Sequence, residues 1–304
     1  MIDREPLPRS DNSGAQASEC RCEPPRGAAR AAGGLLYPAN RLMIFVQEPA
    51  NGEFRSKRIT IMNTVQSSRV AGDITIIVPV YDTLVEHLDE CMRSIFAQTV
   101  VPHEILVADD GSTLEETRTY LRGLQVLSGV RVVRSDRNIG LGPIMNRALR
   151  QVQTPFALKL DSDDIARPEL MEKHAAFLAE GDEVDVVGCQ SQNFGLTDIV
   201  SDTPARVTKD YVLNHRWFVG HTGVLLNKHS VLAVGGYRRM RGMAEDYELW
   251  MHMILRGYRR FYNLPDVLVD YRDLPTGLHR NFRPRWNRGM RILLKMLMRM
   301  CPDF

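Results

Sequence analysis

From residue 74 onward, short apolar runs alternate with segments whose apolar residues recur at helical spacing. The run Ile74–Val80 is almost continuously apolar, which is typical of a strand buried on both faces. In the following segment, Leu84, Leu88, Cys91 and Ile95 lie on one face of a helix. The same pattern predicts strands at 104–108, 130–133 and 156–160, a helix at 113–127 and, after a lead-in at 138–143, a second helix up to about residue 152. It indicates an α/β fold with a mostly parallel, doubly wound central sheet, right-handed crossovers and flanking helices.

The second half of the chain alternates less regularly. We expect it to add strands to one edge of the sheet and to build the wall that faces the sheet's loops. The expected strands are 184–189, 222–226, 260–264 and 267–271, the last two separated by Pro265, and the expected helices are 206–216 and 244–256.

The N-terminal segment differs from the rest. Residues 1–40 are rich in Pro, Gly, Ala, Ser and Arg, a composition typical of disorder. Residues 42–46 and 58–62 suit short strands, but no turn signal connects them to the regular part. We therefore divide the chain into a disordered or weakly structured extension (1–70), an α/β domain (71–275) and a tail (276–304). Met62 precedes the first clear strand, which suggests that translation starts there and that the upstream segment is read-through or an unstructured extension.

Composition narrows the class of protein. The 304 residues are 44% hydrophobic and 25% charged, as in ordinary globular proteins, and the net charge of +2 gives no support for nucleic-acid binding. Five scattered cysteines without metal-binding spacing favour a reducing compartment. No run reaches the length of a transmembrane helix, and the N-terminus lacks the apolar core of a secretory signal. We expect a cytoplasmic protein.

Three acids stand within four positions directly after the strand at 156–160. Alternation along the strand places Asp161 and Asp163 on one side and directs Asp164 elsewhere. Clustered carboxylates repel one another, and two oxygen ligands on one side suit a hard divalent cation that keeps water and phosphate ligands. An acidic turn before the helix near Pro168 explains the same residues without a cation.

Two more polar loops follow predicted strands, at Tyr81–Asp82 and Asp109–Ser112. Ligands of such sheets bind outside the carboxyl ends of the strands. The coincidence of three polar loops at these ends favours a ligand site over a simple acidic turn.

Five motifs follow one another along the chain: Ile76-Ile-Val-Pro-Val-Tyr81, Ile105-Leu-Val-Ala-Asp-Asp-Gly-Ser112, Asn138-x-Gly140, Leu160-Asp-Ser-Asp-Asp164 and Glu245-Asp-Tyr-Glu-Leu-Trp250. Each motif is weak alone, but in this order they resemble the family 2 glycosyltransferases of the GT-A fold. The resemblance covers 74–271. It implies transfer of a sugar from a nucleotide diphosphate sugar to an acceptor hydroxyl, usually with inversion and with Mg²⁺ or Mn²⁺.

The resemblance also implies a role for each acid. Asp161 and Asp163 match the metal-binding pair, and Asp161 and Asp164 are expected beside the donor's diphosphate or sugar. A divalent ion there neutralises the departing diphosphate. Asp246 matches the general base that takes the proton of the attacking hydroxyl. Glu245 and Asp246 also suit the positive end of a helix without any catalytic role.

The resemblance assigns nucleotide binding to the loops that follow the first predicted strands. By the same resemblance, Tyr81 lies against the base, with the carbonyl of Pro79 nearby, and Asp110 reads the base edge. Asn138 and Gly140 precede a helix whose N-terminus suits donor groups. Asp110 also suits an ordinary Asp-Gly-Ser turn, and Asn138 and Gly140 suit a glycine turn with a helix cap.

Some features depart from the family pattern. The family often has a histidine soon after Tyr271-Arg272, but this chain has Asp273, so His279 is not assigned as a metal ligand. His221 suits the acceptor cleft or, equally, the core. The Gln-x-x-Arg-Trp motif of processive synthases is missing, so we expect addition of a single sugar.

The tail is basic. Residues 280–299 contain seven Lys or Arg and no acid, and Arg288, Arg291, Lys295 and Arg299 share one helical face. This pattern suggests binding of residues 280–300 to an anionic membrane surface, on the inner face of the membrane. A terminal helix that packs its apolar face on the domain is the alternative. Membrane binding would suit a lipid-linked acceptor, in polysaccharide or lipopolysaccharide synthesis, and a saccharide acceptor is the alternative.

Two other functions compete. A nucleotidyltransferase needs a glycine-rich phosphate loop with Lys or Arg after the first strand, and Val80-Tyr-Asp-Thr offers none. A non-catalytic module that binds nucleotide sugars is disfavoured by the presence of both Asp163 and Asp246.

Overall fold

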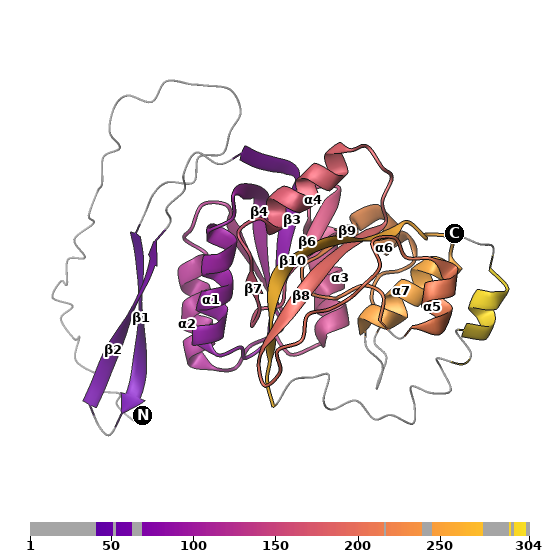
Figure 1. Ribbon diagram of the computed structural model, residues 1–304. Coiled ribbons are helices and arrows are strands. Elements are labelled where there is room, and N and C mark those ends of the chain that lie inside the picture. The colour runs from indigo at the N-terminus through magenta and orange to yellow at the C-terminus, as the bar shows by residue number, and fades with distance from the viewer. Residues whose placement is uncertain are drawn as a thin grey trace, which may run out of the picture. The chain divides into compact units, whose positions relative to one another are not determined.

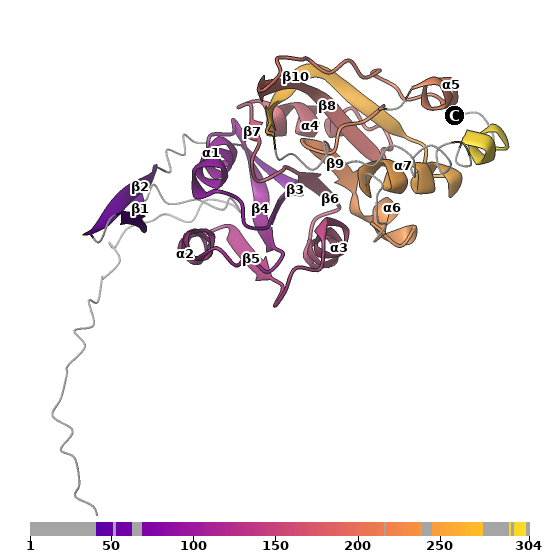
Figure 2. The same cartoon turned by 90° about the horizontal axis from the view of Figure 1, so that it is seen from below.

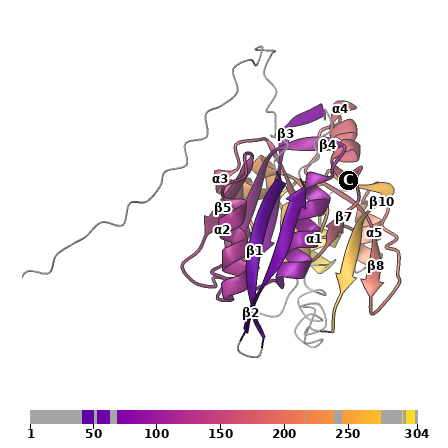
Figure 3. The same ribbon diagram turned by 90° about the vertical axis from the view of Figure 1, so that its left-hand side faces the viewer.

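The computed structural model describes residues 41–50, 53–62, 69–215, 217–238, 245–275, 292 and 295–301. In the N-terminal segment, β1 (Arg41–Ala50) and β2 (Glu53–Met62) form an antiparallel two-stranded ribbon. Arg41 lies opposite Met62, and Figure 3 shows the two strands side by side. The two short strands expected in this segment are therefore present, as parts of one ribbon.

The main domain is built on an eight-stranded mixed sheet with the strand order β5-β4-β3-β6-β9-β8-β10-β7 (Figure 1). The strands are β3 (Arg69–Val80), β4 (Val100–Asp109), β5 (Val130–Arg134), β6 (Phe156–Lys159), β7 (Ile165–Ala166), β8 (Val186–Gly195), β9 (Val224–Asn227) and β10 (Phe261–Asp273). Neighbours from β5 to β6 are parallel, as are β8 and β10, whereas β9 and β7 pair antiparallel with their neighbours. The α/β fold with helices around a large sheet is confirmed, and β9 is the antiparallel strand that joins its two parallel parts.

In the part of the chain that the structure describes, seven helices accompany these strands between residues 85 and 255, and the described tail residues 295–299 are helical as well. The seven helices are α1 (Val85–Phe96), α2 (Glu115–Leu124), α3 (Leu141–Gln151), α4 (Leu170–Ala179), α5 (Lys209–Asn214), α6 (Lys228–Ala233) and α7 (Glu245–Leu255). The expected helices are all present within a few residues of their predicted ends, and α6 is an addition. Figure 2 shows α6 beside α7, and α6 packs against β9 in the middle of the sheet.

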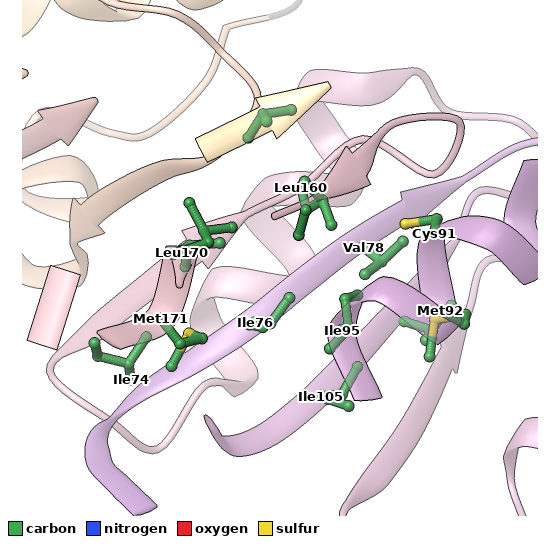
Figure 4. Close-up of a cluster of buried hydrophobic side chains, with 14 of the residues drawn as sticks. Ile74, Ile76, Val78, Cys91, Met92, Ile95, Ile105, Leu160, Leu170 and Met171 are labelled. Atoms are coloured by element: carbon green, nitrogen blue, oxygen red, sulfur yellow. The ribbon is translucent and has the colours of Figure 1, made fainter. Parts of the chain in front are cut away.

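The two faces of the sheet belong to two separate cores. In β3, Ile76 and Val78 point into a core shared with α1, α2 and α4, whereas Ile77 points into a core shared with α3, α6 and α7. Figure 4 shows the first of these cores, where α1 contributes Met92 and Ile95. Because successive side chains of a strand alternate between faces, a continuously apolar strand is required to serve both cores.

One sequence expectation about the sheet is wrong. The segments 260–264 and 267–271 were expected to be two strands, but β10 runs unbroken from Phe261 to Asp273. Its pairing with β8 shifts register between Leu264 and Val267. Pro265 lies in this irregularity, where its missing amide hydrogen costs no ladder hydrogen bond.

The buried face of α1 generates a stability prediction. Leu88 is fully buried, so Leu88→Ala should lower the free energy of unfolding by about 2–5 kcal/mol through lost burial and a residual cavity. Leu114, which is 45% exposed, is the control position. Leu114→Ala should change the free energy of unfolding by less than about 1 kcal/mol. Urea unfolding followed by circular dichroism measures both, and equal losses would contradict the core assignment.

Candidate active site

A cleft of about 600 Å³ lies at the carboxyl ends of β3, β4 and β6. It collects seven of the residues singled out from the sequence: Pro79, Tyr81, Asp110, Asn138, Gly140, Asp161 and Asp163. Two others, Asp164 and Asp246, do not line it. Glu245, which precedes Asp246 at the start of α7, does. The expected convergence of polar loops at one sheet edge is thus observed.

The loop after β3 is fastened to the loop after β4. Asp82 has a positive φ of 48°, and its carboxylate accepts hydrogen bonds from the backbone amides of Thr113 (2.6 Å) and Leu114 (2.9 Å). In return, the Asp82 amide donates to the Ser112 hydroxyl at 3.1 Å. These bonds hold the loop backbone in place while the neighbouring Tyr81 side chain stays 47% exposed at the cleft.

Asp110 organises the next wall of the cleft. Its two carboxylate oxygens accept hydrogen bonds from the backbone amides of Ile139 and Gly140, both at 2.8 Å. Gly140 has a φ of 97° and precedes α3, so Asp110 fixes the approach of the chain to this helix. Each carboxylate oxygen retains a second lone pair for another donor. Gly111 is required here too, because a Cβ atom at this position would lie 2.5 Å from the Arg137 backbone.

The acid loop, defined as Asp161–Asp164, divides its side chains as the alternation predicted. Asp161 and Asp163 face the cleft, whereas Asp164 is buried and accepts a hydrogen bond from the Arg272 amide at 2.8 Å. Burial, with a contribution from the charge of Asp161, raises the pKa of Asp163. Burial also raises the pKa of Asp164 well above its usual range. The structure directs the Asp164 carboxylate to β10 rather than to the cleft, and its expected contact with the donor stays a prediction.

Arg272 on β10 is a support that sequence reasoning did not identify. Its Nε donates to the Asp163 carbonyl at 2.7 Å, and its guanidinium pairs with the Glu90 carboxylate of α1. The guanidinium also lies 4.5 Å from the centroid of the Phe194 ring. One side chain therefore links the acid loop to α1 and to the end of β8.

Lys159 is a second support, on the strand that precedes the acids. Its side chain is fully buried, and its ammonium pairs with Asp161 Oδ2 at 2.6 Å. The ammonium also contacts His221 Nδ1 at 3.1 Å, and His221 Nε2 lies 3.0 Å from the Tyr237 hydroxyl. His221 is therefore part of a polar chain behind the cleft. A lysine inside an apolar strand was the available signal, because buried lysines are almost always paired.

The start of α7 contributes the last two acids. Asp246 is 8% exposed, and its carboxylate accepts a hydrogen bond from the Tyr247 amide at 2.7 Å. Burial raises the pKa of Asp246 to about 6, although the Lys159 charge acts in the opposite direction. A carboxylate with this pKa is ionised at neutral pH and still able to accept a proton, as a general base must be.

The chemistry of the acid loop fits a divalent cation. Asp161 and Asp163 present carboxylates to one cleft, and a cation between them would relieve the repulsion that contributes to the raised pKa of Asp163. Within the described residues, no three His, Cys, Asp or Glu side chains form a metal cluster. Two carboxylates nevertheless suit Mg²⁺ or Mn²⁺, because such ions take their other ligands from water and phosphate.

The tail residues that the structure describes pack on the domain in part. Met298 is fully buried in the core that includes α7, and Lys295 donates to the Leu213 carbonyl. Lys295 therefore does not belong to an outward basic face, whereas Met296 and Met300 are exposed. His279, Arg288 and Arg291 lie outside the described residues. In the part described, no helix has the length and apolarity needed to cross a membrane.

Comparison with protein families gives a match over half of the chain. The model of the family described as "Glycosyl transferase family 2" matches residues 75–233, which include the cleft strands and the acid loop.

Curated relatives carry glycosyltransferase names. An Escherichia coli UDP-Gal:alpha-D-GlcNAc-diphosphoundecaprenol beta-1,3-galactosyltransferase is 28% identical over 189 residues, covering 61% of this chain and 68% of the relative. The amylovoran biosynthesis glycosyltransferase AmsE of Erwinia amylovora is 27% identical over 198 residues, which cover 62% of this chain and 71% of the relative.

Solved structures share the fold. S. aureus TarS in complex with UDP-GlcNAc superposes with a TM-score of 0.61 at 19% identity, covering 74% of this chain and 66% of that chain. The mannosyltransferase PcManGT of Pyrobaculum calidifontis, in complex with GDP-Man and Mn²⁺, superposes with a TM-score of 0.52 at 19% identity. The superposition covers 75% of this chain and 64% of that chain. These likenesses show that the mixed sheet is that of GT-A glycosyltransferases.

Burial of Asp246 predicts an unusual stability effect. Its pKa of about 6 in the folded state exceeds the ordinary value of 3.8, so its contribution to stability is present at low pH and lost as pH rises through 6. Asp246→Asn should therefore raise the free energy of unfolding at pH 8 by about 2 kcal/mol and leave it nearly unchanged at pH 4. Urea unfolding at both pH values tests this, with the exposed Asp202→Asn as control. A variant less stable than wild type at pH 8 would contradict it.

Proposed function

The chain belongs to glycosyl transferase family 2, and from this premise we propose that it transfers one sugar from a nucleoside diphosphate donor to an acceptor hydroxyl, with inversion. The observation that carries the proposal is the single cleft that collects polar residues from the ends of β3, β4 and β6 and from the start of α7. Donor and acceptor must meet in one place for in-line transfer, and this cleft has carboxylates on both sides.

The first loops suit the nucleotide. The exposed ring of Tyr81 offers a flat surface for the base, and the Pro79 carbonyl and the Asp110 carboxylate lie in the same cleft. Asn138 and Gly140 line the cleft where α3 begins, and the amides of a helix N-terminus attract phosphate. Asp110 supports binding in two ways, because it holds that helix start and keeps lone pairs for the base.

Asp161 and Asp163 would hold Mg²⁺ or Mn²⁺ against the donor's diphosphate. When bound, the ion supplies positive charge that stabilises the departing diphosphate. Asp164 supports this arrangement from behind, since it ties the acid loop to the Arg272 backbone. The proposal agrees with the complex of PcManGT, a protein of the same fold, with GDP-Man and Mn²⁺.

On the acceptor side, Asp246 would take the proton of the attacking hydroxyl. Burial gives it a pKa of about 6, which suits a base that works near neutral pH. Glu245 lines the cleft directly before it and would contact the acceptor. Attack from the side opposite the leaving diphosphate gives inversion at the anomeric carbon.

We propose a lipid-linked acceptor at an anionic membrane, in bacterial cell-surface polysaccharide synthesis. The name of the Escherichia coli relative includes a diphosphoundecaprenol-linked acceptor, which supports this acceptor class, and the name of the Erwinia amylovora relative, with amylovoran biosynthesis, supports polysaccharide synthesis. The basic residues of 280–299 other than Lys295 and the exposed apolar side chains of Ile292, Met296 and Met300 support membrane binding. We include in this proposal a position on the inner face of the membrane.

A donor screen tests the transfer reaction. Purified protein with Mn²⁺ or Mg²⁺ should release nucleoside diphosphate from a preferred nucleotide sugar when an acceptor is present. Asp163→Asn should lower this rate at least about 100-fold, because a ligand of the charge-neutralising cation is lost. The variant should keep the circular dichroism spectrum of the wild type.

The control for that screen is Asp182→Asn, at an exposed acid away from the cleft, which should keep full activity. Unchanged turnover in Asp163→Asn would remove the metal-site assignment.

Membrane binding is tested separately with liposomes. Truncation would remove the buried Met298, so substitutions are preferable. Replacement of Arg283, Arg285 and Arg288 by Gln should lower binding to liposomes of anionic lipid at least about tenfold in sedimentation, since each basic residue contributes about 1 kcal/mol. Neutral liposomes are the control, and equal sedimentation of variant and wild type would refute the role of the tail.

A further inference from the structure

Lys159 presents a fixed positive charge to the acid loop. It lies on β6 between β3 and β9, and its side chain has no exposed surface. Its ammonium is 2.6 Å from Asp161 Oδ2. A buried ammonium is stable only when paired, so this contact is a permanent part of the folded domain.

The second contact of Lys159 determines a histidine tautomer. An ammonium group only donates, so His221 Nδ1, 3.1 Å away, must accept. The proton of the neutral ring then sits on Nε2 and is donated to the Tyr237 hydroxyl at 3.0 Å. Burial and the Lys159 charge hold the pKa of His221 well below its usual range, which agrees with a neutral ring. Lys159 is therefore held from both sides and cannot swing out of the sheet without breaking both contacts.

This arrangement changes how the cleft attracts a cation. Asp161 and Asp163 together would attract a divalent ion strongly, but one oxygen of Asp161 is already neutralised by Lys159. A second cation that approaches the same carboxylate meets the repulsion of the ammonium. A nucleoside diphosphate brings several negative charges into the cleft and removes that disadvantage.

We propose that Lys159 is a positioning residue that keeps the affinity of the empty cleft for a bare divalent cation low, so that the cation binds together with the nucleoside diphosphate. This inference rests on the proposed function, which places the cation at Asp161 and Asp163. Lys159 also keeps Asp161 paired after the product has left, so the empty site does not depend on a metal for its charge balance.

The test is Mn²⁺ binding to the full chain, measured by calorimetry with and without UDP or GDP. In the wild type, one of these nucleotides should raise Mn²⁺ affinity at least about tenfold. Lys159→Met removes the charge at nearly constant volume and should raise the affinity for bare Mn²⁺ about tenfold, with a smaller gain from the nucleotide. Lys159→Gln should do the same while still donating a hydrogen bond to Asp161.

Two further variants separate charge from geometry. Lys159→Arg keeps the charge and should keep the weak binding of bare Mn²⁺. Lys173→Met removes a lysine charge that pairs with Asp266 on the surface and should change nothing. Thermal unfolding identifies the folded variants, and Lys159→Gln decides the outcome if Lys159→Met does not fold.

The possible failures are distinguishable. If bare Mn²⁺ binds to folded Lys159→Met or Lys159→Gln as weakly as to the wild type, or more weakly, the inference about Lys159 is overturned while the metal site stands. If Mn²⁺ binds to neither the wild type nor any variant, with or without either nucleotide, the metal assignment in the proposed function fails as well.

Discussion

Repulsion among the three carboxylates of the acid loop is the constraint on which the rest of the site depends. The loop is stable because cationic and polar groups reach it from several directions. Lys159 pairs with Asp161 from the same strand, while Arg272 binds Asp163 and Asp164 through its side chain and its amide. The cleft can therefore hold two carboxylates toward a ligand while the third is used to anchor the loop.

The sheet determines where this loop lies. β3 is buried on both faces, so two cores fix it in position and, through it, its neighbours β4 and β6. The polar loops at the ends of these three strands then meet without any need for a long connection. The antiparallel β9 brings the second half of the chain against β6, and this half also contributes Glu245 to the lining of the cleft.

Much of this arrangement follows from local sequence pattern. Alternation predicted the strands up to β6 and the separation of Asp161 and Asp163 from Asp164, because side-chain direction in a strand is a local property. The partners of these acids were not predictable in the same way. Lys159 meets His221, and Asp164 meets Arg272, only after distant segments pack, and no local rule encodes which polar groups will face each other. The continuity of β10 through Pro265 was missed for the same reason, since its pairing with β8 overrides the local break.

The link between Asp164 and Arg272 joins positions 108 residues apart. A ribosome delivers the acid loop well before it delivers β10, and during that interval the loop lacks its anchor. The nascent chain thus carries a cluster of negative charge whose geometry is not yet set. Contacts of such long sequence separation form late in folding. The geometry of the acid loop is therefore complete only after β10 has been made and has packed against the loop.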